Sequence, residues 1–235
     1  MNTSRVLMIL TVFGLSLNAC SSAPAEPDPD PMGEAPAPTA APLVFIGDQP
    51  HISFTAFAES VGSAEPKEEV SLLGKEGKGS AAGIITTGGL ITRDGATQRV
   101  LLAGRPGALY EVAVLDSWSE SPDFMPYAQV RLDGEDLPEG VFQLSYDAGR
   151  TKEVEGGTSY DHTGTALLCK EADGRIACAS FIVSKGAYVE PAEGASDYDL
   201  PNGIIVGRDD GTVEVVHMVA GDEITPAGYY TLTGP

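Results

Sequence analysis

Residues that commonly carry catalysis are sparse in this 235-residue chain. Its histidines, His51, His162 and His217, stand far apart, and none lies in a spacing typical of a zinc site. Tyr160-Asp161-His162 lies in a stretch rich in Gly, Thr and Ser, which contains the side chains that a general base requires. Such stretches are also ordinary turns, and adjacent side chains rarely point at one another. We therefore expect a loop at this position and no catalytic residue, metal or cofactor, and an enzyme that uses this loop stays an alternative.

One connecting segment is rich in aromatic residues. Residues 116–127 resemble a loop in their Ser, Pro and Asp content, yet they contain Trp118, Phe124 and Tyr127. Aromatic side chains in a loop can stack on sugar rings or anchor a protein partner. The commoner alternative is that Trp118 and Phe124 fold back and close one end of the domain. We take the three aromatic residues as the candidate binding site.

The first twenty residues have the layout of a secretory signal peptide. Arg5 precedes an apolar run over residues 6–17 that is too short to span a bilayer as a helix. The segment ends in Leu17-Asn18-Ala19-Cys20, which resembles the lipobox of bacterial lipoproteins. The resemblance covers residues 1–20 only. It implies that residues 1–19 are removed and that Cys20 is acylated and becomes the first residue of the mature protein.

This resemblance also implies a location. Bacterial lipoproteins carry two or more acyl chains, enough for stable attachment to a membrane. Ser21 and Ser22 follow the cysteine, where an Asp would favour retention in the inner membrane. We therefore expect a lipid-anchored protein of the cell envelope, held at the outer membrane through the lipid on Cys20.

Composition separates a tether from a globular domain. Residues 21–42 contain seven prolines, six alanines and four acidic residues, and no Lys or Arg. Such a segment cannot bury enough apolar surface to offset the entropy of ordering it, so we expect a disordered tether over residues 20–42 and one domain over residues 43–235. The formal net charge of −20 at pH 7 opposes the binding of nucleic acid and other polyanions.

The domain has the pattern of an all-β protein. Gly-rich turns separate short runs of Val, Ile, Leu, Tyr and Thr, which predicts a β-sandwich of about ten antiparallel strands. A single helix is expected over Pro66–Leu73. The expected strands are Ile84–Thr92, Thr97–Ala103, Tyr110–Leu115, Ala128–Leu132, Val141–Tyr146, Thr165–Lys170, Arg175–Ser184, Gly203–Gly207, Thr212–Val219 and Gly228–Thr233.

The two remaining cysteines are expected to form a disulfide. If Asp173-Gly174 makes a two-residue hairpin turn, Cys169 lies directly opposite Cys178. Counting outward from the turn, the two fall on a non-hydrogen-bonded pair, where side chains approach most closely. An exported protein meets an oxidising compartment, and the spacing differs from the Cys-x-x-Cys of redox enzymes. We therefore predict a structural disulfide.

Two segments resemble each other within the chain. Residues 134–145 and 221–233 both contain an acidic turn, a Pro-x-Gly sequence and an alternating strand that includes leucine. One interpretation is a duplication with halves near 43–150 and 151–235. The other is convergence, because a strand entered through Pro-x-Gly is common in β-sandwiches.

These observations predict a lipid-anchored envelope domain with a non-catalytic binding or structural role. Its partner would be a protein or a glycan that contacts loops such as residues 116–127. An alternative is a small-ligand carrier, in which the strands close into a β-barrel around an apolar pocket lined by Phe142, Tyr146 or Tyr230. The enzyme described above is the second alternative.

Overall fold

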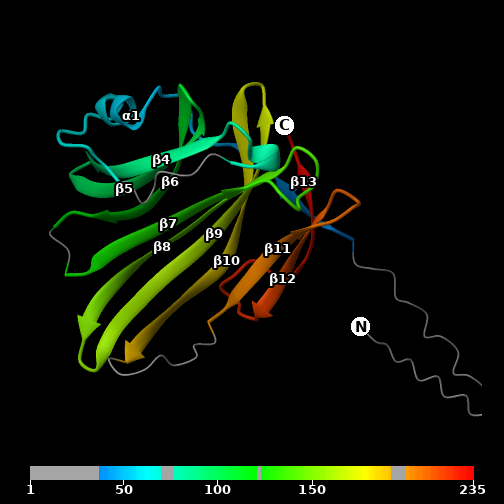
Figure 1. Ribbon diagram of the computed structural model, residues 1–235. Helices are drawn as coiled ribbons and strands as arrows, with labels where there is room; N and C mark the ends of the chain where they lie inside the picture. The colour runs from blue at the N-terminus through cyan, green and yellow to red at the C-terminus, as the bar shows by residue number, and fades with distance from the viewer. Residues whose placement is uncertain (1–36, 70–76, 121–122, 192–199) are drawn as a thin grey trace, which may run out of the picture. The chain divides into compact units, whose positions relative to one another are not determined.

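Two β-sheets contain most of the residues that the computed structural model describes, which are 37–69, 77–120, 123–191 and 200–235 (Figure 1). The structure thereby confirms a mostly β protein. Cys20, the signal peptide and most of the expected tether lie outside the described residues. No helix in the described ranges is long and apolar enough to cross a membrane.

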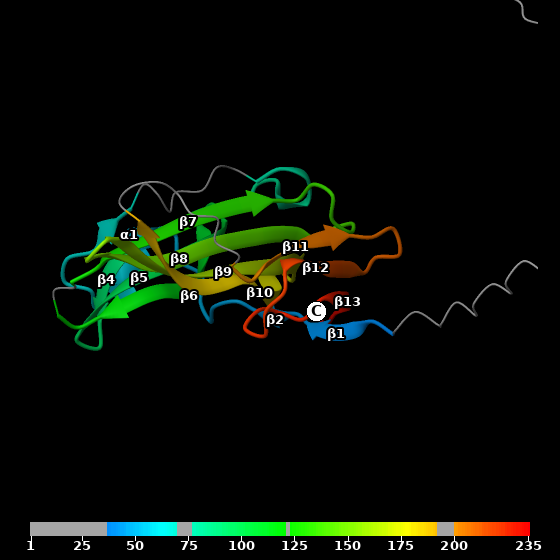
Figure 2. The ribbon, with the colours of Figure 1, turned by 90° about the horizontal axis from the view of Figure 1, so that it is seen from below.

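The larger sheet has nine strands. Across the sheet they are β1 (Thr39–Pro42), β13 (Gly228–Thr233), β12 (Val213–Val219), β11 (Asn202–Gly207), β10 (Arg175–Pro191), β9 (Gly157–Ala172), β8 (Phe142–Val154) and β7 (Met125–Asp133), while β2 (Val44–Phe45) pairs with β10. The expectation of purely antiparallel strands is wrong at one edge, where β1 and β13 pair in parallel. The two strands lie side by side in Figure 2. The expected tether includes residues 39–42, yet these residues form β1, and Ala41 is buried there.

The smaller sheet has four strands, in the order β3-β4-β5-β6. They are β3 (Lys67–Glu68), β4 (Ile85–Arg93), β5 (Ala96–Arg105) and β6 (Ala108–Trp118), and a 3-10 turn at Gly79–Ala81 precedes β4. The prediction of a helix over Pro66–Leu73 is wrong at Lys67–Glu68, which pairs with β4 as a strand. Residues 70–73 of that prediction lie outside the described residues.

A helix that the sequence analysis missed, α1 (Phe54–Ser60), packs against the smaller sheet. The Ser53 side chain caps it by accepting a hydrogen bond of 3.1 Å from the backbone amide of Ala56. Phe54, Phe57 and Ala58 recur at helical spacing and are all buried. This apolar stripe packs on side chains of β4 and β5, which explains why so short a helix is stable.

Both faces of the long strands β8–β10 are packed over part of their length. Because side chains alternate along a strand, Leu167 and Cys169 face the smaller sheet, whereas Leu168 faces the other side. There Leu168 and Phe181 join a second apolar cluster with side chains of β12 and β13. The neighbours β11–β13 of the same sheet therefore cover part of its own face.

The sheets are open and do not repeat one another. β1 and β7 form the edges of the larger sheet, and β3 and β6 those of the smaller one, so neither sheet closes on itself. Strands from residues 43–150 and from residues 151–235 mix in the larger sheet. The two parts of the chain therefore do not form separate sheets, and the duplication stays a prediction.

Candidate functional site

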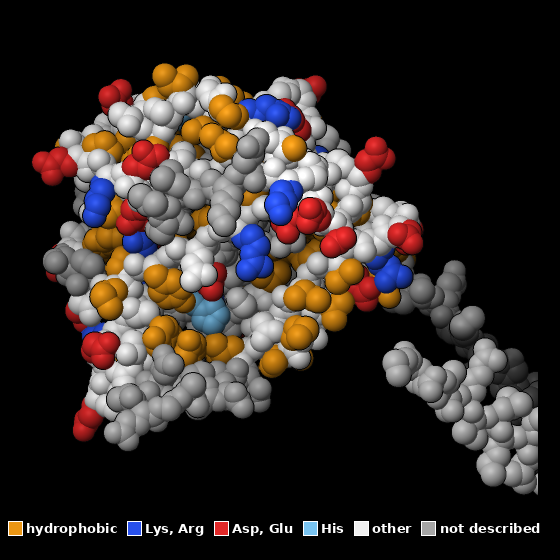
Figure 3. All heavy atoms as spheres, in the orientation of Figure 1, with side chains coloured by type: hydrophobic (Ala, Val, Ile, Leu, Met, Phe, Trp, Pro, Cys, Tyr) orange, Lys and Arg blue, Asp and Glu red, His pale blue; other side chains and the backbone are white. Residues whose placement is uncertain are grey.

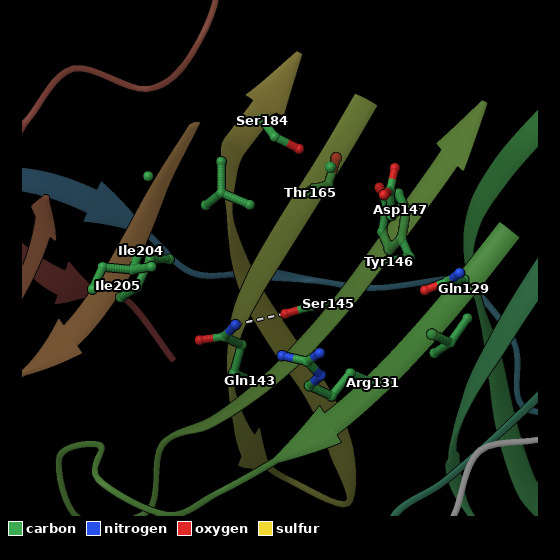
Figure 4. A pocket seen from close by; sticks show the side chains of 14 residues that line it. Gln129, Arg131, Gln143, Ser145, Tyr146, Asp147, Thr165, Ser184, Ile204 and Ile205 are labelled. Carbon is green, nitrogen blue, oxygen red and sulfur yellow. Dashed lines mark hydrogen bonds between the residues drawn. The ribbon is translucent and has the colours of Figure 1, made fainter. Parts of the chain in front are cut away.

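A groove of about 430 Å³ lies between the strands β7–β10 and the strand β11. Polar side chains of β7 and β8 line its floor, and Ile204 and Ile205 of β11 line the opposite side (Figure 4). In a flat sheet β7 and β11 would stand about 19 Å apart, since neighbouring strands are about 4.8 Å apart. The sheet therefore curls, so that β11 lies over one face of its own neighbours. We call this hollow the β7–β11 groove.

The strand register places one polar row across the floor of the groove. Gln129 lies opposite Asp147, Asp147 lies opposite Gly164, and Gly164 lies opposite Ser184. Glycine in the middle of a strand weakens a sheet and often marks a close approach. A Cβ atom on Gly164 would lie 2.3 Å from Ser184 Oγ. The glycine therefore allows the Ser184 hydroxyl to lie across β9 and line the groove.

A second polar row lies beside the first. Arg131 is opposite Ser145, and Gln143 precedes Ser145 on the same face of β8. Gln143 Nε2 donates a hydrogen bond of 2.5 Å to Ser145 Oγ (Figure 4). Because this oxygen accepts from the amide, the hydroxyl hydrogen of Ser145 remains available to a ligand. The floor thus presents a guanidinium, an amide oxygen and a hydroxyl donor together.

Asp147 and Tyr127 form one end of this face. Asp147 Oδ1 is buried and has no hydrogen-bond partner among the described residues. Tyr127 lies two residues before Gln129 on β7 and therefore on the same face. Burial, and next the charge of Asp147, raise the pKa of Tyr127 to about 12. The Tyr127 hydroxyl is therefore protonated at neutral pH and is a hydrogen-bond donor beside the carboxylate.

The segment Tyr160-Asp161-His162 is not a loop, which corrects the sequence-based expectation. It lies within the long strand β9, where Tyr160 and His162 share one face and Asp161 points to the other. Tyr160 stacks on Tyr188 of β10 with ring centroids 4.8 Å apart, and His162 approaches the same ring edge-on at 6.5 Å. Strand geometry therefore separates the Asp and His side chains that a catalytic pair would need to join.

Trp118 and Phe124 pack on each other and on the sheet. Their rings meet edge-to-face with centroids 6.3 Å apart, and the Arg150 guanidinium lies 4.3 Å from the centroid of the Phe124 ring. Asp116 holds Arg150 in place and raises its pKa through a hydrogen bond. Arg150 lies three residues after Asp147 on β8, and an odd spacing along a strand places two side chains on opposite faces. The contact between Arg150 and Phe124 is therefore on the face opposite the groove. Of the three aromatic candidates, only Tyr127 is on the groove face.

Of the three aromatic residues proposed to line an apolar pocket, Phe142 and Tyr230 belong to the core. Phe142 is buried in the cluster between the two sheets, and Tyr230 packs with Phe181 in the second cluster. Tyr146 is half-buried beside the first cluster and also lines the β7–β11 groove. The β7–β11 groove that Tyr146 lines has polar as well as apolar side chains in its walls. The predicted disulfide is present in the same core: Cys169 pairs with Cys178 in the expected register, with an Sγ–Sγ distance of 2.08 Å and Cα atoms 4.1 Å apart.

Among the described residues, no group of three or more His, Cys, Asp or Glu side chains is placed to hold a metal ion. Asp210, in an acidic turn, accepts hydrogen bonds from the amide and hydroxyl of Thr212. These bonds lower the pKa of its carboxyl group and account for it as a turn residue.

Comparison with known proteins adds no relative: no protein-family model, no curated protein and no solved structure matches the chain.

Sequence reasoning did not identify the groove residues. Gln129, Arg131 and Asp133 alternate with apolar residues along β7, and Gln143, Ser145 and Asp147 do so along β8. This alternation is readable in the sequence, but it normally indicates a solvated face. Only the return of β11 over that face turns it into a groove.

Proposed function

We propose that the protein is a lipid-anchored, β-sandwich domain of the cell envelope that binds a saccharide, without catalysis, in the β7–β11 groove. The lipobox at Cys20 supports the anchor, and the two sheets that share one core are consistent with a sandwich. The groove with its register-matched polar rows is the observation that carries the binding role.

The chemistry of the groove suits a saccharide. Sugars present hydroxyl groups at their rims and apolar C–H faces, so their sites combine planar polar side chains with apolar or aromatic surface. Gln129, Gln143 and Asp147 offer such polar groups, and Ile204, which is 49% exposed, offers apolar surface. In the view of Figure 3, basic, polar and hydrophobic side chains are intermixed over β7–β10, although the chain as a whole is acidic.

The same groove argues against hydrolysis. Glycoside hydrolysis normally requires two carboxyl groups on either side of the scissile bond. Among the described residues that line the groove, Asp147 is the single carboxylate and no histidine is present. Asp161 and His162 are adjacent in the sequence, but their side chains point to opposite faces of the sheet.

A binding screen tests the proposal. The mature acylated protein, in detergent, is titrated with a panel of neutral and acidic oligosaccharides. Gln143→Ala should weaken any binding about fivefold, because a lost hydrogen bond is worth about 1 kcal/mol. Gln49→Ala, an exposed glutamine outside the groove, is the matched control and should bind as the wild type does. Binding that responds equally to both variants, or no binding to any saccharide, would contradict the proposal.

In-cell crosslinking separates this proposal from a protein partner. Trp118 and Phe124 pack on the far face from the groove, so a saccharide-binding role predicts that their replacement by alanine leaves saccharide binding intact. A stoichiometric protein partner that is lost in this double variant would instead place the binding surface at residues 116–127.

A further inference from the structure

We infer that Arg131 forms an anion subsite in the β7–β11 groove, so that the bound saccharide carries a carboxylate. This inference rests on the proposed saccharide-binding function and names the class of sugar. It makes Arg131 the residue that determines specificity for acidic over neutral ligands.

The first observation is that Arg131 has no partner in the part of the chain that the structure describes, although acidic residues outnumber basic ones by 34 to 14. Every other described arginine has one. The pairs are Arg93 with Glu111, Arg99 with Glu69, Arg105 with Glu171, Arg150 with Asp116, Arg208 with Glu214, and Arg175 with the Gly47 carbonyl and the Phe45 ring. Arg131 therefore stands apart from a consistent pattern of pairing.

The second observation is the orientation of its neighbours. The Arg131 side chain extends toward Gln143 and away from Asp147 (Figure 4). Ser145, directly opposite Arg131, accepts from Gln143 and keeps its own hydrogen for a ligand. The guanidinium and the hydroxyl thus offer hydrogen-bond donors on one side of the groove, with the Asp147 carboxylate held at the other end.

A carboxylate is the ligand group that fits these donors best. A guanidinium presents a planar fork that binds a carboxylate through two parallel, charge-assisted hydrogen bonds, which hydroxyl groups match less well. A polyanion is disfavoured by the net charge of −20 and by Asp133 and Asp136, which line an adjoining hollow with Arg131. The structure therefore favours a saccharide with an isolated carboxylate, such as a single uronic acid residue.

Nuclear magnetic resonance of arginine side chains tests the subsite directly. The full mature protein, labelled with ¹⁵N-arginine, is titrated with glucuronate and separately with glucose. Glucuronate should shift the Nε–Hε signal of Arg131, identified by its loss in Arg131→Lys, and glucose should not. Equal shifts with both sugars, or no shift with either, would overturn the inference.

Affinity measurements on matched ligands test specificity. The probes are disaccharides with one uronic acid, each paired with its methyl ester, which keeps the sugar rings and removes the charge. Arg131→Gln should lower affinity for the acids about tenfold and that for the esters clearly less, since a hydrogen bond to a charged group is worth about 1.5–3 kcal/mol and a neutral one about 1 kcal/mol. Lys67→Gln, which removes an exposed lysine of β3, is the control for net charge. Acids and esters that bind wild type equally would refute the inference.

The two experiments separate the inference from the function on which it rests. Saccharide binding that ignores both the carboxylate and Arg131 would leave the proposed function standing and reject the anion subsite. An Arg131 signal that responds equally to glucuronate and to acetate, without binding of any oligosaccharide, would confirm an anion subsite and reject the saccharide function.

Discussion

At the scale of single residues, Gly164 shows how a groove is built into a sheet. A side chain at this position would point into the groove, and its Cβ would meet Ser184 Oγ at 2.3 Å. Strand interiors disfavour glycine, because it adds backbone entropy and packs no side chain. The presence of glycine at position 164 is therefore explained by the space that the groove floor requires, and not by the stability of β9.

Gly164→Ala should accordingly destabilise the protein by about 1 kcal/mol, because a new methyl group overpacks the contact with Ser184. Adding Ser184→Ala removes the clashing oxygen and should restore part of that stability. Denaturant titration of the two single variants and the double variant gives the coupling between the sites. Additive effects within error would show that the two side chains do not compete for the same space.

Tyr127 gives a prediction for alkaline pH. Its pKa of about 12 in the folded protein lies above the ordinary value of about 10. The folded state therefore favours the neutral phenol, and this stabilisation is complete below the unfolded pKa and is lost as the pH rises through the folded one. Solvent screens a half-buried group, so wild type should lose about 1 kcal/mol relative to Tyr127→Phe between about pH 9 and about pH 11.

Urea denaturation of both proteins at the two pH values measures this difference. Parallel loss of stability in wild type and Tyr127→Phe would mean that Tyr127 ionises as readily in the folded protein as in the unfolded chain. Burial and the charge of Asp147 would then have no net effect on the phenol.

At the scale of elements, local sequence patterns were sufficient for the hairpins. Asp94-Gly95 and Asp173-Gly174 both have positive φ, as a tight two-residue turn requires, and the predicted cross-strand partners around the second turn are all observed. The register of a short hairpin depends on adjacent residues, and for that reason the disulfide could be predicted without any tertiary information.

The same local reasoning failed for the helix. Pro66 and Gly74 have the residue types of helix ends, but Lys67–Glu68 pairs with β4, and the Glu68 carboxylate accepts a hydrogen bond of 2.6 Å from Thr87. Conversely, α1 is short and lacks acidic residues in its first turn. Its stability comes from packing on β4 and β5, which the sequence of α1 alone does not reveal.

The disulfide between Cys169 and Cys178 should contribute to the stability of the β9–β10 hairpin. It closes a loop with a sequence separation of 9 residues, so its loss should lower the free energy of unfolding by about 2 kcal/mol. The β9–β10 pairing continues on both sides of it, and we expect the fold to persist. Chemical denaturation of Cys169→Ala/Cys178→Ala measures the loss; alanine is chosen because both positions are buried. A double variant as stable as wild type would show that the bond contributes nothing beyond the hairpin.

At the scale of the whole molecule, the groove depends on contacts that no local pattern encodes. β11 pairs with β10 at only one position, Ser184 with Asn202, and then lies over the face of β7–β10. Gly207, at the end of β11, approaches the backbone of Asp136, where a Cβ would lie 2.4 Å from the carbonyl oxygen. The polar alternation of β7 and β8 was visible in the sequence, but its conversion into a groove depends on this return of the chain.

The proposed lipid anchor at Cys20 would act on the whole protein. Cys20→Ser removes the thiol that acylation requires. The sequence contains no run of about 20 apolar residues that could span a bilayer in its place. The variant should therefore move from the membrane fraction to the soluble fraction of fractionated cells, while Ser21→Ala, which keeps the cysteine, should remain bound. Mass spectrometry of the wild type should show an acylated N-terminal cysteine.

Retention of Cys20→Ser in the membrane, or a wild-type chain cut elsewhere without a lipid, would contradict the anchor. Because the groove is formed entirely by residues 129–205, its ligand binding should be unchanged in the released variant. Equal affinity of the anchored and released proteins for one saccharide would therefore show that the lipid determines where the groove works and not what it binds.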